Sequence, residues 1–156
     1  MRRPTAALTA LGLMAAALAG CAHEQAANQD YRWTFLKDAG EAPRLAYGRP
    51  ASDEVLLMLA CSPGADSVRI SATGLGDREI VLGSDNAQSR FPAQRTETAM
   101  AEQGLLEARG RMSASALAGF QLTGRLAVLD SGTRHRLDAG RADRSQVQAF
   151  FRSCAV

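Results

Sequence analysis

The feature that most constrains this fold is a two-residue period of apolar side chains, which recurs in short segments along most of the chain. Within 54–61 the alternating positions are Val55, Leu57, Leu59 and Cys61, and the residues between them are also apolar. Alternation places these four side chains on one face of a strand. Because both faces are apolar, 54–61 is expected to be a central strand of a β-sheet.

The same period predicts further short strands. In 31–36 the aromatic residues Tyr31, Trp33 and Phe35 alternate with the residues between them, which is typical of a strand. Turn-forming residues at 62–66 predict a hairpin that leads into the next strand. The other expected strands are 44–47, 68–72, 79–82, 89–91, 104–109, 126–129 and 134–137, and a hairpin turn at 130–133 joins the last two.

Two segments carry helical signals. A short helix with Leu117 and Phe120 on it is expected to be capped by Ser113 and to end near Gly124. A C-terminal helix, capped by Asp143, is expected because apolar residues recur at i, i+3, i+4 and i+7. These residues are Val147, Phe150, Phe151 and Cys154. The fold class is therefore α+β and β-dominated, an antiparallel sandwich or half-open barrel with these two helices.

Residues 1–20 have the organisation of a secretory signal peptide. Arg2 and Arg3 give a positive start, 6–19 is almost wholly apolar, and no acid precedes Glu24. The apolar run is shorter than the roughly 20 residues that span a bilayer, so a permanent transmembrane helix is the weaker interpretation.

The end of this segment, Leu18-Ala19-Gly20-Cys21, resembles the lipobox of bacterial lipoproteins. The resemblance implies cleavage before Cys21 and acylation of its thiol, and two or more acyl chains anchor a protein stably. The alternative is an ordinary signal peptide whose cleavage site precedes a cysteine. Ala22, in place of an aspartate, resembles the outer-membrane sorting pattern. The polar, Ala-rich segment that follows is expected to be a tether, with the lipidated Cys21 at its start, over 21–30, and the length of the rest fits one periplasmic domain at 31–156. The resemblance implies that this domain is held at the outer membrane.

The mature chain would be close to neutral. The whole sequence has 18 lysines and arginines against 16 acids, and removal of Arg2 and Arg3 leaves 16 of each. Proteins that bind nucleic acid usually show a basic excess, so nucleic acid is not expected as a partner. The expected partners are the membrane, through the lipid, and a protein of unknown identity.

Once Cys21 is acylated, Cys61 and Cys154 are the two cysteines that remain. An even number in an oxidising compartment predicts a disulfide, and both patterns point the thiols into the core. The alternative is two buried free thiols. The order of the expected elements and this cysteine pair resemble small disulfide-bonded periplasmic domains, of the invasion-associated locus B type or the accessory type of type VI secretion. That resemblance carries over no functional residue.

No catalytic or metal-binding constellation is expected. Ser131, His135 and Asp138 are close in sequence, but Ser131 lies in the hairpin turn, too far along the strand to reach the imidazole. A surface histidine on a strand is expected instead. His23 and His135 are far apart and lack the spacing of a zinc site, and no calcium loop occurs. No cofactor is therefore expected.

Two pairs of residues are candidates for a contact surface. Arg134 and Arg136 share one strand face and would contact anionic lipid or peptidoglycan carboxylates. The alternative, which we favour, is a solvated face with local ion pairs. Tyr31 and Trp33 would form a platform for a glycan or a partner. Packing in the core is the favoured alternative, because the domain has few other large aromatic residues.

The function expected from these observations is that of a membrane-anchored, non-enzymatic binding or scaffold module that acts through protein contacts. The first alternative is an inhibitor of a small periplasmic or host enzyme, such as a lysozyme. A hydrolase with an unrecognised site is the second.

Overall fold

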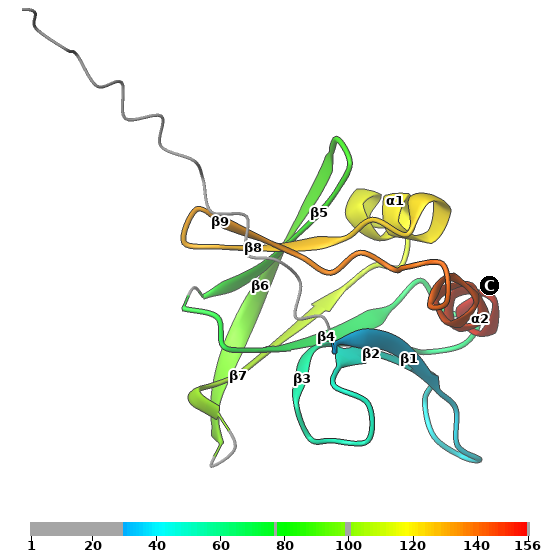
Figure 1. The fold of residues 1–156 in the computed structure, drawn as a ribbon, viewed down its shortest axis with the longest axis horizontal. Coiled ribbons are helices and arrows are strands. Elements are labelled where there is room, and N and C mark those ends of the chain that lie inside the picture. Colours follow the sequence, from blue (N-terminus) through cyan, green and yellow to red (C-terminus); the bar gives the residue numbers. More distant parts are fainter. Residues whose placement is uncertain (1–29, 77, 99–100, 156) are drawn as a thin grey trace, which may run out of the picture.

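The computed structural model describes residues 30–155, apart from residues 77 and 99–100 (Figure 1). The predicted signal peptide, Cys21 and nearly all of the predicted tether therefore lie outside the described residues. Within the described ranges, no helix is long and apolar enough to cross a membrane.

In the described part of the chain, nine strands form one antiparallel sheet with the order β1-β2-β3-β4-β7-β6-β5-β8-β9. The predicted central strand is β3, which has a neighbour on each side and buries Leu57, Leu59 and Cys61. Each strand that the sequence predicts is present. The strands are β1 (Arg32–Leu36), β2 (Arg44–Gly48), β3 (Val55–Cys61), β4 (Val68–Thr73), β5 (Glu79–Ser84), β6 (Ala87–Thr98), β7 (Ala101–Gly110), β8 (Ala127–Asp130) and β9 (Thr133–Arg136).

Strand β6 is much longer than predicted, and it bends the sheet into a half-barrel. Its first half, up to Pro92, pairs with β5, whereas its second half, from Ala93 onward, pairs with β7. Proline has no backbone N–H to donate to a ladder, so Pro92 fits the point where the strand changes partner. The strand order begins at β1 and ends at β9, which leaves the barrel half open. The β-dominated α+β fold with a half-open barrel is thus confirmed.

Helices α1 (Ser115–Thr123) and α2 (Arg144–Cys154) lie on the same side of the molecule (Figure 1). Helix α1 packs on β5 and β6, and α2 packs on β1 and β2. The apolar stripe predicted for the C-terminal helix is buried in full. Gly124 ends α1 in the left-handed conformation, with φ of 69°, as predicted.

The start of α2 protects the edge of the sheet. The backbone N–H groups of Trp33 and Phe35, on the edge strand β1, donate to Asp143 Oδ2 (3.3 Å) and Gln146 Oε1 (3.1 Å). An uncovered edge strand would expose these donors to pairing with another chain. Asp143 does occupy the N-cap position, but its carboxylate makes no capping bond to the helix. The predicted capping role is therefore wrong, because the carboxylate accepts a hydrogen bond from β1 instead.

Ser113 does not cap α1, contrary to the prediction. The helix begins two residues later, at Ser115, and Ala114 is its N-cap residue. The Ser113 hydroxyl donates to Asp66 Oδ2 (2.7 Å), and the Ser113 backbone N–H donates to Asp66 Oδ1 (2.8 Å). Arg111 Nε also donates to Asp66 (2.7 Å). The carboxylate of the β3–β4 turn thus holds the entry to α1.

These contacts make the stability of the fold depend on pH in the acid range. The hydrogen bonds from Ser113, and then the one from Arg111, lower the pKa of Asp66 from 3.8 to about 2. Because the folded pKa lies below the unfolded value, Asp66 stabilises the fold above pH 3.8, and this contribution is lost as the pH falls toward 2. We expect Asp66→Asn to lower the melting temperature at pH 7, and the difference from the wild type to shrink across this pH window.

Thermal unfolding followed by circular dichroism between pH 7 and pH 2 measures this effect. The matched control is Asp53→Asn, because the exposed Asp53 side chain makes no hydrogen bond to the described residues. Its difference from the wild type should not change over the same pH range. A difference for Asp66→Asn that is equally large at pH 7 and pH 2 would contradict the prediction.

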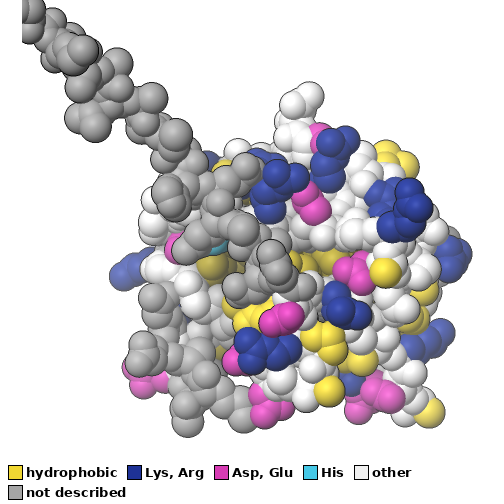
Figure 2. Space-filling model, viewed as in Figure 1, with side chains coloured by type: hydrophobic (Ala, Val, Ile, Leu, Met, Phe, Trp, Pro, Cys, Tyr) yellow, Lys and Arg dark blue, Asp and Glu magenta, His cyan; other side chains and the backbone are white. Residues whose placement is uncertain are grey.

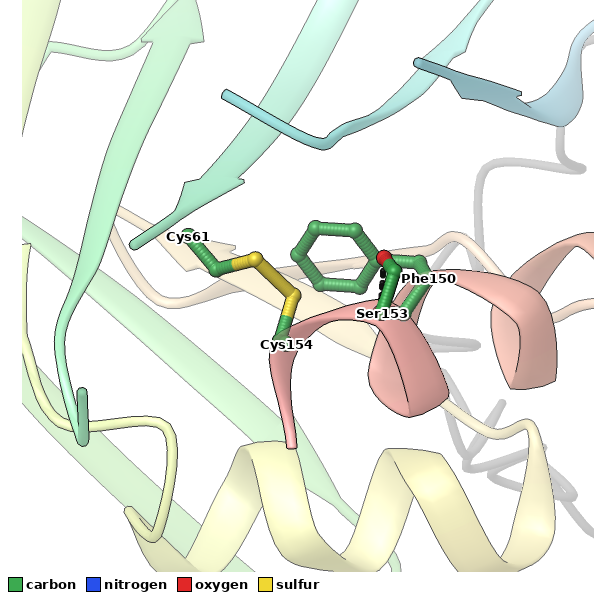
Figure 3. The surroundings of a disulfide bond; sticks show 4 residues. All are labelled: Cys61, Phe150, Ser153 and Cys154. Carbon is green, nitrogen blue, oxygen red and sulfur yellow. Dashed lines mark hydrogen bonds between the residues drawn. A yellow bond between two sulfur atoms is a disulfide. The ribbon is translucent and has the colours of Figure 1, made fainter. Parts of the chain in front are cut away.

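The predicted disulfide is present (Figure 3). It joins Cys61, at the end of β3, to Cys154, at the end of α2, with the two Cα atoms 5.8 Å apart. Both cysteines are buried, and the ring of Phe150 lies beside the bridge. The Ser153 hydroxyl donates to the carbonyl oxygen of Phe150 (2.8 Å). The bridge therefore fastens the last helix to the central strand.

Candidate binding site

A small apolar pocket opens at the mouth of the half-barrel. It has a volume of about 170 Å³ and lies between β3 and β4 on one side and the β8–β9 hairpin on the other. On the face that this hairpin crosses, apolar side chains show at the centre, with charged side chains around them (Figure 2). The residues that line the pocket are Leu56, Thr73, Gly74, Leu75, Val128, His135 and Leu137.

The β8–β9 hairpin supplies one wall. Its turn is formed by Ser131 and Gly132, with φ of 48° and 81°, and positive φ at both central residues is the geometry that suits a two-residue hairpin. The register places Val128 directly opposite His135. After β9 the pairing continues, because the Leu137 N–H donates to the carbonyl oxygen of Leu126 (2.8 Å). Val128, His135 and Leu137 therefore share the inner face.

The end of β4 and the loop after it supply the opposite wall. The Thr73 hydroxyl donates to the carbonyl oxygen of Val55 (2.7 Å), so it is turned toward β3. Gly74 has φ of 73°, a conformation that side chains rarely adopt, and it turns the chain after the strand. Arg95 Nη2 donates to the carbonyl oxygens of Leu75 (2.9 Å) and Gly76 (3.3 Å). The Arg95 side chain thus holds the backbone at Leu75 in place beside the pocket.

His135 is the only titratable side chain in the pocket lining, and it is half-buried. The expected surface histidine is thus only partly exposed, because β9 turns His135 toward the pocket and Arg134 and Arg136 outward. Among the described residues the His135 imidazole has no hydrogen-bond partner, although the backbone of His135 pairs with β8. Asp138 accepts from the Leu126 N–H (3.1 Å) and from Arg136 Nη2 (2.8 Å) instead.

The pocket thus lacks the paired imidazole and carboxylate that a hydrolytic triad needs. Ser131, His135 and Asp138 are close along the chain, but the Asp138 carboxylate is directed to other partners. Over the described residues, no group of three His, Cys, Asp or Glu side chains could hold a metal ion. What the arrangement can do is bind an apolar group beside one imidazole.

The residues predicted for a contact surface have different positions in the structure. Trp33 is 1% exposed, so the platform prediction is wrong for it and the core-packing alternative is confirmed. Tyr31 is half-buried, and its hydroxyl donates to Glu54 Oε2 (3.1 Å). Arg134 and Arg136 are both exposed on the outer face of β9, as predicted. Arg136 forms an ion pair with Asp138, as the alternative expected.

Known proteins do not add a family to this description. Comparisons of the chain with protein-family models, with curated proteins and with solved structures found no match. The mouth pocket, the charged surfaces and the sequence signals near Cys21 are therefore the features that bear on function.

Proposed function

We propose that this chain is a lipoprotein, anchored to the outer membrane through acyl chains on Cys21, that acts as a non-enzymatic binding module for a partner protein. The signal-peptide pattern and the motif Leu18-Ala19-Gly20-Cys21 support the anchor. The observation that supports binding is the mouth pocket, where the fold leaves apolar side chains facing a cavity instead of covering them.

The size of the pocket favours a protein partner over a small-molecule ligand. Pockets for small molecules usually measure roughly 300–1,000 Å³, whereas this one measures about 170 Å³. An apolar cavity of about 150 Å³ takes up a single benzene ring. The pocket therefore matches one leucine or phenylalanine side chain. A single buried anchor of this kind often supplies much of the energy of a protein interface.

The position of the pocket favours a partner at the membrane. Tyr31, the first residue after the predicted tether, bonds to Glu54, which lies two residues before Leu56 of the pocket. The residue at which the predicted tether would join the domain and the pocket are therefore at the same end of the domain. A tether over 21–30 extends at most about 35 Å. The anchored protein would hold this end of the domain close to the outer membrane, so the partner is expected to be in or on that membrane.

Photo-cross-linking in cells tests the proposal. A photoreactive residue is placed at Thr133, which lies on the same face of β9 as His135, two residues away. We expect one dominant cross-linked partner in the membrane fraction. The variant His135→Trp, which fills the pocket, should remove this product while leaving the circular dichroism spectrum unchanged. A photoreactive residue at Gln148, on the exposed side of α2, is the matched control and should not give it.

Two results would contradict the proposal. The first is a cross-linked product from Thr133 that persists in the His135→Trp variant, since binding would then not depend on the pocket. The second is turnover of a cell-wall or lipid substrate by the purified protein, abolished by a point substitution. If the partner proves to be an enzyme that the protein slows, the module acts as an inhibitor.

A further inference from the structure

The outer face of the sheet carries two arginines placed directly against each other. Arg69 on β4 and Arg109 on β7 are opposite residues in the antiparallel register, and both are exposed. Directly opposite side chains in a sheet have Cβ atoms only about 5 Å apart. Like charges at that distance destabilise a strand pair. In the register of the described strands, no other two basic residues face each other in this way.

This pair differs from most arginines of the domain, which have a partner on the protein. Arg95 and Arg144 donate to backbone carbonyl oxygens. The guanidinium groups of Arg69 and Arg109 have neither an ion pair nor a hydrogen bond among the described residues. The arginines that form ion pairs with acids are Arg44, Arg49, Arg90, Arg111, Arg125 and Arg136. Two guanidinium groups are therefore left together without a counter-charge at ion-pair distance.

The surface around the two arginines is hollowed rather than flat. A depression of about 430 Å³ is lined by Arg69, Arg109 and neighbouring residues of β6 and β7. Gln94, which adds amide donors, lies opposite Glu107 in the register. The Glu107 carboxylate forms no ion pair with either arginine within the described residues. With two positive charges and one negative, the depression keeps a net positive charge and several N–H donors on one side.

We propose that Arg69 and Arg109 form a binding site for a phosphate group on the outer face of the sheet, separate from the mouth pocket. Guanidinium groups match the geometry of phosphate oxygens and bind them through paired, charge-assisted hydrogen bonds. One phosphate between the two groups adds two attractions that offset their mutual repulsion. The phosphate comes either from a lipid headgroup or from a free phosphate, since both present the same oxygens.

Isothermal titration of the full chain, purified in a non-ionic detergent at low ionic strength, tests the site. The probes are inorganic phosphate and monomeric dihexanoyl phosphatidylglycerol. We expect saturable binding of at least one probe, weakened at least about tenfold in the double variant Arg69→Gln/Arg109→Gln. The control Arg141→Gln/Arg152→Gln removes the same charge from other exposed positions, and its affinity should stay within about twofold of the wild type.

Glu107→Gln provides a second, opposite readout. Because it removes a negative charge from the depression, it should tighten phosphate binding several-fold and leave the fold intact. The two probes are compared on the wild type. If it binds the lipid probe more tightly than inorganic phosphate, the source is a headgroup, and the reverse order identifies a free phosphate. No saturable binding of either probe would overturn the proposal. So would an equal loss of affinity in the Arg141→Gln/Arg152→Gln control, which would show general charge attraction only.

Discussion

Replacing Cys61 and Cys154 together by alanine is expected to lower the free energy of unfolding by about 4–5 kcal/mol. The bridge joins residues that are 93 positions apart. In the chain-entropy model, a loop of that length removes much conformational freedom from the unfolded chain. Single domains are stable by only about 5–15 kcal/mol in total. The bridge is thus expected to contribute a large fraction of the stability, which urea unfolding followed by circular dichroism would measure.

Two comparisons separate the bridge from the packing around it. Treating the wild type with a reducing agent should lower its unfolding midpoint to about that of the double variant. Ser153→Ala is the matched control, because it changes a residue beside Cys154 whose hydroxyl bonds to the Phe150 carbonyl oxygen. The Ser153→Ala variant should lose about 1 kcal/mol of the free energy of unfolding. Two reactive free thiols in the native protein, or equal midpoints for the double variant and the wild type, would contradict the prediction.

The disulfide and the main elements could be predicted because their signals are local in sequence. Alternation at Val55, Leu57 and Leu59 defines a strand face whatever the rest of the chain does. The stripe that ends at Cys154 likewise defines one side of a helix. Each pattern places its cysteine among inward residues, so a bond between Cys61 and Cys154 required only that both faces meet in one core.

The pocket on the inner face of β9 could not be predicted. Alternation in β9 separates His135 from Arg134 and Arg136, but it does not say which face is buried. The structure turns His135 inward, where it lines one pocket together with Leu56 and Leu75. These residues come from separate strands and a loop, so no local pattern reports that they are neighbours. The pocket lies where the β8–β9 hairpin faces β3 and β4 without pairing with either strand.

Competition between distant partners also lay beyond a sequence pattern. Ser113 is a suitable helix cap in isolation, but its hydroxyl donates a hydrogen bond to Asp66, 47 residues earlier. The Asp143 carboxylate likewise accepts a hydrogen bond from the backbone N–H of Trp33, 110 residues away. Side-chain caps contribute only about 1 kcal/mol. An interaction of similar strength with another element is therefore enough to redirect them.

Trp33→Ala is expected to lower the free energy of unfolding by about 3–5 kcal/mol, because it leaves a large cavity in the core. The Trp33 ring is 1% exposed, and its centroid lies 5.2 Å from that of Tyr47 and 4.9 Å from that of Phe120. It therefore connects the first strands with α1. Urea unfolding followed by far-ultraviolet circular dichroism measures the loss, since the variant has no tryptophan left to report by fluorescence.

Trp33→Phe separates the packing of the ring from its hydrogen bond. Trp33 Nε1 donates to the carbonyl oxygen of Leu137 (2.7 Å), a residue that also lines the mouth pocket. Phenylalanine keeps much of the packing but leaves this buried oxygen without its donor, which costs about 1–3 kcal/mol. Leu122→Ala, at a side chain that is 77% exposed, should cost no more than about 0.5 kcal/mol. If Trp33→Ala were as mild as Leu122→Ala, Trp33 would not support the core. If Trp33→Phe were as severe as Trp33→Ala, the bond to Leu137, rather than ring packing, would hold the strand in place.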